Sequence, residues 1–384
     1  MFTDQQYLML PGPTPVPPRV LRALSQPMIN HRGPEFKLLM ERVLAGVKYI
    51  YQTQNEIVLF PSSGTGVLEA SVANFISRGD QVLAISIGVF GDRFATIAER
   101  FGARVERLKF PMGQAADPNL VEAALKKDPH HNIKAVLVTH NETSTGVKND
   151  IKAIRQAMGS HPALLMVDAV SGLGAMEFRT DEWGVDVAAS GSQKAFMLPP
   201  GLGFLCFSPR ARQIAEQCDA PRFYWDIRTS LDYQAKGQTA VTPPLSIYYG
   251  LAEALDMLEE ETIDNVVNRH QHYRNIVRAG VRSMGLELLA DEAVASSAVT
   301  AVVAPPELGS NKIRQHMLEK YNVVLGGGQQ HLDNIIFRIG HLGAVRNLDL
   351  IAVIAALEMG LKELGLPVVL GKAVAAAQQV MLDQ

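Results

Sequence analysis

Two ionisable residues of this 384-residue sequence, a lysine and an aspartate, each follow a short apolar run. Such a run predicts a buried strand, so both side chains are candidates for burial and for a changed pKa. Lys194 follows the run 185–189, and Asp168 ends the run 163–167. Burial lowers the pKa of an amine, and a neutral amine can attack a carbonyl group to form an imine. An acid that pairs with a pyridinium nitrogen would complete the protein's share of pyridoxal phosphate chemistry. From these two residues alone, an ordinary Lys–Asp pair near two strand ends is the slightly better interpretation.

The segment Ser63-Gly64-Thr65-Gly66 lies between a predicted strand at 56–60 and a predicted helix at 67–77. Free backbone N–H groups at a helix start, together with hydroxyl groups, bind phosphate well. The segment is neither a Walker A loop nor a dinucleotide-binding GxGxxG motif. Because Ser and Thr also serve as plain helix caps, a cap without a ligand is an equally good interpretation.

Three further features follow or interrupt predicted strands. Phe90 lies between two glycines and could stack on a flat ring, although a lone phenylalanine is more often a core residue. The polar segment 140–146 suits either ligand contact or a turn. Arg338 lies inside an apolar run, where burial without an anionic partner would be costly. Either a substrate carboxylate or an internal salt bridge could satisfy it.

Strands and helices alternate between residues 56 and 207. Strands are predicted at 56–60, 81–85, 104–108, 133–138, 163–167, 185–189 and 203–207, and helices at 67–77, 92–101, 119–127 and 151–158. This alternation predicts an α/β fold, in which helices cover both faces of a mostly parallel sheet and ligands bind at the carboxyl ends of the strands.

The pattern changes after Pro243-Pro244. Helices are predicted at 245–259, 263–284, 312–321, 348–364 and 373–381, with short strands at 299–303 and 335–339. The proline-rich start of the chain should form an extended arm. We therefore expect an arm over residues 1–20, a large α/β domain over 21–245, and a smaller α+β domain over 246–384 that includes the long linking helix.

The composition is typical of a soluble globular protein, with 47% hydrophobic and 20% charged residues. A formal charge of −3 gives no reason to expect nucleic acid, and no run approaches the ~20 apolar residues that span a membrane. Two cysteines and the absence of a signal-peptide pattern predict a cytoplasmic protein. The ten histidines show no HExxH-type spacing, so no metal site is expected.

Seven segments in order resemble the class V pyridoxal-phosphate aminotransferases. They are Leu10–Pro13, Ser63–Gly66, Gly91–Phe94, His140–Gly146, Val167–Val170, Gly191–Lys194 and Phe337–Gly340. The most similar group comprises the alanine–glyoxylate, serine–glyoxylate and serine–pyruvate aminotransferases, and the resemblance runs from about residue 8 to residue 365. Together these segments outweigh the interpretation of Lys194 as an ordinary surface lysine.

The resemblance implies roles for twelve residues. Lys194 would hold the cofactor as an imine, Asp168 would pair with its pyridine nitrogen, and Arg338 would bind the substrate carboxylate beside the backbone of Gly12. The other implied cofactor contacts are Ser63, Gly64, Thr65 and Gln193 at the phosphate, Phe90 and Val170 on the two faces of the ring, Thr143 near its hydroxyl, and Thr242 reaching the phosphate from a neighbouring subunit.

The resemblance also implies a fold-type I architecture, a seven-stranded large sheet, an obligate homodimer with shared sites, and a ping-pong transaminase. The amino group would pass from alanine or serine to glyoxylate or pyruvate. Phosphoserine or aminoethylphosphonate remain possible substrates, and a non-catalytic regulatory subunit is the alternative from another class. A cysteine desulfurase would need a later nucleophilic cysteine, but the two cysteines are Cys206 and Cys218.

Overall fold

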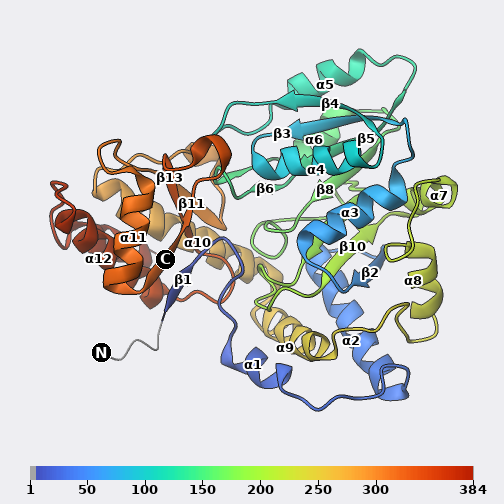
Figure 1. Ribbon diagram of the computed structural model, residues 1–384, viewed down its shortest axis with the longest axis horizontal. Helices are drawn as coiled ribbons and strands as arrows, with labels where there is room; N and C mark the ends of the chain where they lie inside the picture. Colours follow the sequence, from blue (N-terminus) through green and yellow to red (C-terminus); the bar gives the residue numbers. More distant parts are fainter. Residues whose placement is uncertain (1–5, 384) are drawn as a thin grey trace.

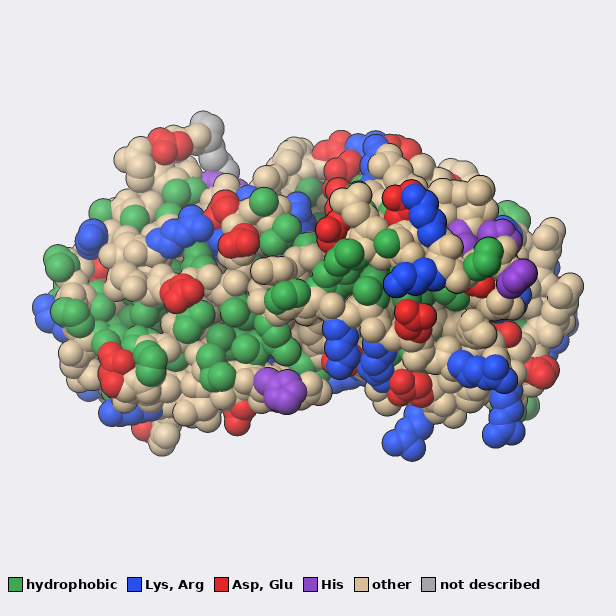
Figure 2. Space-filling view, turned by 90° about the horizontal axis from the view of Figure 1, so that it is seen from above, with side chains coloured by type: hydrophobic (Ala, Val, Ile, Leu, Met, Phe, Trp, Pro, Cys, Tyr) green, Lys and Arg blue, Asp and Glu red, His purple; other side chains and the backbone are tan. Residues whose placement is uncertain are grey.

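A computed structural model describes residues 6–383 and shows two lobes, each built on its own β-sheet (Figure 1). The larger lobe holds a seven-stranded sheet and the smaller lobe a four-stranded sheet. The two lobes meet at a narrower waist when the molecule is seen from above (Figure 2). On that face acidic and basic side chains are interspersed, and neither sign forms a continuous patch.

The large sheet has the strand order β2-β10-β9-β8-β5-β3-β4, and all neighbouring pairs are parallel except those made by β10. Its strands are β2 (Glu56–Phe60), β3 (Gln81–Ser86), β4 (Arg104–Lys109), β5 (Ile133–Thr139), β8 (Leu164–Asp168), β9 (Val187–Gly191) and β10 (Gly203–Phe207). The fold class predicted from the alternation of strands and helices is confirmed.

Alternate residues of the central strands face opposite sides of the large sheet, as the two-residue period of a strand requires. On one side, residues such as Leu83 and Val136 pack against α2 (Pro34–Tyr51), α5 (Pro118–Lys126), α6 (Ile151–Met158) and α9 (Leu245–Glu261). On the other side, residues such as Val82 and Leu137 pack against α3 (Gly64–Phe75), α4 (Val89–Arg100), α7 (Pro209–Gln217) and α8 (Ile227–Gln234). Both faces are therefore buried.

The small sheet has the order β1-β12-β13-β11. Its strands are β1 (Tyr7–Met9), β11 (Val299–Val303), β12 (Val323–Gly327) and β13 (Ile336–Gly340), and its helices are α10 (Ile263–Ser283), α11 (Gly309–Tyr321), α12 (Asn347–Glu363) and α13 (Lys372–Leu382). Apolar residues of the sheet, including Phe337, share one hydrophobic cluster with residues of α10, α11, α12 and α13. The short helix α1 (Pro18–Leu24) packs instead against α9.

Several boundaries differ from the sequence predictions. The strand β12 was not predicted, because its sequence ends in Gly326-Gly327, a pair that weakens the strand pattern. The start of the proline-rich arm is not wholly irregular, since β1 pairs in parallel with β12 at the sheet edge. Helix α4 begins at Val89 rather than at residue 92, so Phe90 lies in its first turn.

The predicted domain limits 1–20, 21–245 and 246–384 stay a prediction, and residues 1–5 of the expected arm and residue 384 lie outside the described residues. The helix α9 begins at the expected limit, but its residues Leu251 and Leu255 belong to the hydrophobic cluster of the large sheet. The strand β1 of the arm belongs to the small sheet.

Over residues 6–383, no helix combines the length and the apolar character that crossing a bilayer requires.

Candidate active site

The functional residues predicted from the sequence gather where the parallel strands of the large sheet end. Asp168 is the last residue of β8, and Lys194 follows β9 by three residues. The strand β2 leads into α3, whose first residue is Gly64. Because carboxyl ends of parallel strands share one edge of the sheet, residues far apart in sequence meet there.

Lys194 is held beneath the arm that begins the chain. Its Nζ donates a hydrogen bond to the carbonyl oxygen of Pro11, with an N···O distance of 2.5 Å. Its own carbonyl oxygen accepts hydrogen bonds from Thr14 Oγ1 at 3.1 Å and from the backbone N–H of Met197 at 2.9 Å. A Cβ atom on Gly12 would collide with the Lys194 amine, so only glycine fits there. The arm therefore forms one wall of the lysine site.

Burial lowers the pKa of the Lys194 amine to about 8. The charge of Asp168 opposes this shift, whereas the nearby Arg338 and Arg93 add to it. No ion pair at contact distance joins Lys194 to Asp168 within residues 6–383, so the interpretation of an ordinary Lys–Asp pair is not supported. A substantial neutral fraction at pH 7 makes the amine a usable nucleophile.

Asp168 is a buried carboxylate with one backbone hydrogen bond to its Oδ1, from the N–H of Val170 at 3.0 Å. Burial raises its pKa to about 7, the Val170 hydrogen bond opposes this, and the charge of Glu142 adds to it. A positively charged ring nitrogen placed against it would favour the ionised form. The side chain thus suits the predicted role of a partner to a protonated pyridine.

The start of α3 forms a cradle of backbone N–H groups. Its N-cap residue Ser63 makes no side-chain capping bond, whereas the N-cap residues of α5, α6, α7 and α8 each accept one. A Cβ on Gly64 would press against Val170, and the side chain of Gln193 lies beside the same turn, with a buried Oε1 that has no partner in the described chain. Phosphate oxygens would accept hydrogen bonds from the uncapped N–H groups and from the Nε2–H₂ group of Gln193, whereas its Oε1, itself an acceptor, would need a different partner.

A hydrogen bond between Thr143 and Arg338 joins the large lobe to the small sheet. Thr143 is buried, and its carbonyl oxygen accepts a hydrogen bond from Arg338 Nη1 at 2.9 Å. Arg338 Nε also donates to the Gly327 carbonyl at 2.8 Å. No Asp or Glu in residues 6–383 forms an ion pair with Arg338. Burial lowers the pKa of the Arg338 guanidinium to about 10, so the group remains charged at neutral pH. The arginine therefore suits a carboxylate ligand.

Thr65 and Thr242 differ in their surroundings. The Thr65 hydroxyl lies at the first turn of α3, 3.4 Å from Arg93 Nη1. Thr242 is exposed in the segment between α8 and α9, and within residues 6–383 no hydrogen bond joins it to the other predicted residues. Within one chain, the structure thus brings together eleven of the twelve predicted residues and leaves Thr242 apart.

Two charged residues near this site had no predicted role. The guanidinium carbon of Arg93 lies 4.7 Å from the centre of the Phe90 ring. Glu142 is fully buried, and its carboxylate accepts a hydrogen bond from the backbone N–H of Phe90 at 2.9 Å. The polar segment 140–146 marked the region, but sequence alone does not show which of its side chains is buried.

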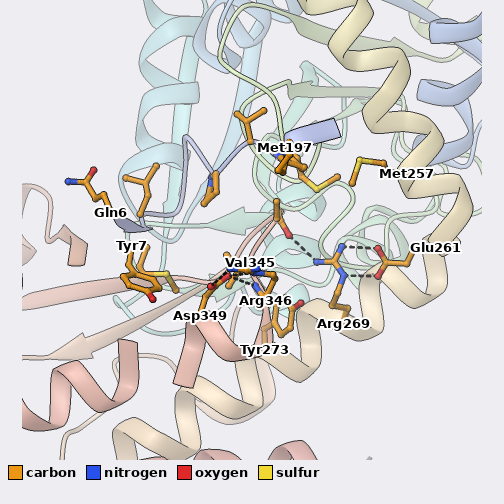
Figure 3. Close-up of a pocket in the computed structure, with 18 residues that line it drawn as sticks. Gln6, Tyr7, Met197, Met257, Glu261, Arg269, Tyr273, Val345, Arg346 and Asp349 are labelled. Atoms are coloured by element: carbon orange, nitrogen blue, oxygen red, sulfur yellow. Dashed lines mark hydrogen bonds and ion pairs between the residues drawn. The ribbon is translucent and has the colours of Figure 1, made fainter. Parts of the chain in front are cut away.

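A cavity of about 490 Å³ is lined by residues of the arm, of helices α9 and α10, and of the segment 343–349 (Figure 3). Met197 and Gly343 line it, and Glu261 and Arg269 form a paired bridge on one wall. None of the twelve predicted site residues lines this cavity. In the described part of the chain, no group of three or more His, Cys, Asp or Glu side chains is arranged to hold a metal ion.

The lowered pKa of Lys194 predicts an unusual pH dependence for its reaction with aldehydes. In cofactor-free protein, the rate of reductive alkylation at Lys194 should rise about tenfold per pH unit at low pH, because only the neutral amine reacts. The rate should level off near the pKa of about 8. An ordinary lysine, with a pKa of ~10.4, would reach this plateau more than two pH units higher. Mass spectrometry of the peptide that contains residue 194 measures this rate.

Two variants should move that inflection in opposite directions. Arg338→Gln removes a charge that lowers the pKa of Lys194, so the inflection should move up, whereas Asp168→Asn removes a charge that raises it, so the inflection should move down. An inflection near that of ordinary lysines in the unmodified protein would contradict the buried environment described above.

Comparisons with known proteins identify the family of this chain. The family model described as "Aminotransferase class-V" matches residues 6–347. The chain is 43% identical over 98% of its length to a soluble hydrogenase, small subunit, of Synechococcus sp. (strain PCC 6716), covering 99% of that protein. It is 42% identical to the L-aspartate–glyoxylate aminotransferase of Paracoccus denitrificans (98% and 96% covered) and 40% identical to the serine–glyoxylate aminotransferase of Methylorubrum extorquens (99% and 96% covered).

A solved structure has the same fold over the whole chain. The ureidoglycine–glyoxylate aminotransferase from Bacillus subtilis superimposes with a TM-score of 0.93 at 30% identity, covering 100% of this chain and 99% of that one. The predicted fold-type I architecture is confirmed. The chain belongs to the class V aminotransferases, a family of enzymes that depend on pyridoxal phosphate.

Proposed function

We propose that this protein transfers the amino group of a small L-amino acid, alanine or serine, to glyoxylate or pyruvate. The observation that supports this most is the buried amine of Lys194, whose pKa lies near 8 and which responds to the charges of Asp168 and Arg338 without forming an ion pair with Asp168. Three relatives named above act on glyoxylate according to their names, which favours glyoxylate as the acceptor.

Pyridoxal phosphate, when bound, supplies an aldehyde that captures amines and a ring that accepts electrons. The N–H groups at the start of α3, with Ser63, Thr65 and Gln193, would hold its phosphate. Asp168 would keep the ring nitrogen protonated, and Phe90 and Val170 would lie against the ring. Thr143 would lie near the hydroxyl of the ring.

The protein's own groups would then bind the substrate and move one proton. Arg338 would hold the α-carboxylate through charge-assisted hydrogen bonds, which fixes the orientation of the Cα–H bond. The neutral amine of Lys194 would take the Cα proton at Nζ and pass it to the aldehyde carbon of the cofactor, and in the second half of the reaction it would carry a proton in the opposite direction. The Pro11 carbonyl and Gly12 close one side of the lysine site, so a small substrate fits best there.

A panel of amino donors tests the proposed function. Protein loaded with pyridoxal phosphate should form pyruvate from L-alanine and glyoxylate, and L-serine should also serve. L-aspartate, phosphoserine and aminoethylphosphonate, measured at matched concentrations, should be poorer donors. The variant Lys194→Ala should lose turnover and should no longer be fixed to the cofactor by borohydride. Faster turnover with a phosphorylated donor would favour that alternative, and no turnover with any donor would favour a regulatory subunit.

The position of Arg338 predicts a specific loss of substrate binding. Truncation to Ala should weaken binding of the amino donor by roughly 2–5 kcal/mol, because the substrate carboxylate loses its buried partner. The KM should rise by more than kcat falls, and Arg338→Lys should recover only part of the loss, since lysine cannot form the forked contact. An unchanged KM would exclude Arg338 as the carboxylate ligand.

We also propose a homodimer in which Thr242 completes the phosphate site of the partner subunit. The exposure of Thr242 in a single chain supports this, since a residue that contacts a second subunit has no need of partners within its own. Two free, buried cysteines support the proposal that the protein is cytoplasmic.

Mixing two inactive variants tests the shared site. In mixed dimers of Lys194→Ala and Thr242→Arg chains, one site carries both substitutions and the other carries neither. Mixing after unfolding and refolding should therefore restore roughly a quarter of the unmodified activity if subunits assort at random. If Thr242 served its own chain, every site would carry one substitution and no activity would return. Analytical ultracentrifugation of each variant confirms that dimers form.

A further inference from the structure

Helix α4, which carries Phe90, begins without a capping side chain of its own. Its N-cap residue is Gly88, and no side-chain capping bond comes from that position. Each helix start leaves backbone N–H groups that need acceptors, and leaving them buried and unpaired is costly. The acceptors for α4 come from a segment more than fifty residues away in the sequence.

The acceptors are the side chains of Glu142 and Ser144. Glu142 Oε2 accepts hydrogen bonds from the N–H groups of Phe90 at 2.9 Å and Gly91 at 3.1 Å. Ser144 Oγ accepts one from the N–H of Val89 at 3.1 Å. The first three N–H groups of α4 are therefore all satisfied from the segment that follows β5.

The other carboxylate oxygen of Glu142 is held within its own turn. Glu142 Oε1 accepts hydrogen bonds from the Ser144 hydroxyl at 2.6 Å and from the Ser144 N–H at 3.1 Å. Four hydrogen bonds thus fix a carboxylate that has no exposed surface. A Cβ on Gly88 would run into the side chains of Glu142 and Ser144, so this close approach requires glycine at residue 88.

The same turn reaches the opposite side of the site. Thr143, between Glu142 and Ser144, accepts the hydrogen bond from Arg338 Nη1 through its carbonyl oxygen. The turn therefore connects Phe90, which would lie on the cofactor ring, with Arg338, which would hold the substrate carboxylate.

We infer that Glu142 is a positioning residue that fixes the Phe90 ring against the cofactor by holding the first turn of α4. This inference rests on the proposed cofactor site. Glutamine in place of Glu142 would present an amide N–H₂ group either to the N–H groups of Phe90 and Gly91 or to Ser144. One set of donors would then lose its acceptor, and the first turn of α4 would loosen.

The test measures the dissociation constant of pyridoxal phosphate in two backgrounds, by titration of cofactor-free protein. Glu142→Gln should raise this constant about tenfold when Phe90 is present. In the Phe90→Ala background, the same substitution should change it less than about twofold, because the ring that Glu142 positions is absent. Glu99→Gln, at an exposed glutamate in the last turn of α4, is the matched control and should leave the constant unchanged.

Each outcome decides a different question. An unchanged constant in Glu142→Gln, or equal increases in the two backgrounds, would overturn the positioning role, since a general loss of stability would act in both. If Glu142→Gln does not fold, Ser144→Ala gives the same comparison with a smaller increase. Failure of the unmodified protein to bind pyridoxal phosphate would instead contradict the proposed function.

Discussion

The site depends on a lysine amine that is kept from water without a carboxylate in contact with it. Burial of a charged amine is costly, so the equilibrium moves toward the neutral form, and the pKa of Lys194 falls to about 8. The structure maintains this state with one carbonyl acceptor, from Pro11. A carboxylate at contact distance would have raised the pKa of Lys194 and kept its amine protonated, and a protonated amine is not a nucleophile.

This constraint explains why both sheets and the arm are needed around one residue. The large sheet brings Asp168 and the lysine segment to one edge, while the arm that carries Pro11 is anchored by β1 at the edge of the small sheet. The backbone of Leu10 and Pro11 lies so close to Gly340 that no side chain fits there. Gly340 follows Arg338 by two residues on β13, so one strand positions both the arm and the carboxylate ligand.

Much of this arrangement can be predicted from the sequence, and the failures have physical causes. The inner strands of the large sheet are mostly apolar runs because both faces are buried, which makes them easy to recognise, whereas the edge strand β4 (RVERLK) is largely charged and partly exposed. The strand β12 contains Gly326-Gly327, and the start of α4 has no capping residue in its own sequence, so local patterns miss both. The ordered motifs contain ten of the twelve predicted site residues, all except Phe90 and Thr242, whereas burial of Glu142 depends on how the 140–146 turn packs.

Helices α3 and α4 both begin at the site, and the backbone N–H groups at their starts have different acceptors. Neither has a capping bond from its own N-cap side chain, a lack that they share with α1, α2, α9, α10, α11 and α13, whereas α5, α6, α7 and α8 have one. At α4 the N–H groups are satisfied by Glu142 and Ser144, which makes that turn rigid. At α3 the N–H groups face the site beside Gln193, where an anion is the natural acceptor. An uncapped helix start is therefore not specific to the site. What distinguishes the two helices is that buried side chains from the 140–146 segment accept from the first N–H groups of α4, whereas within residues 6–383 no side chain accepts from those of α3.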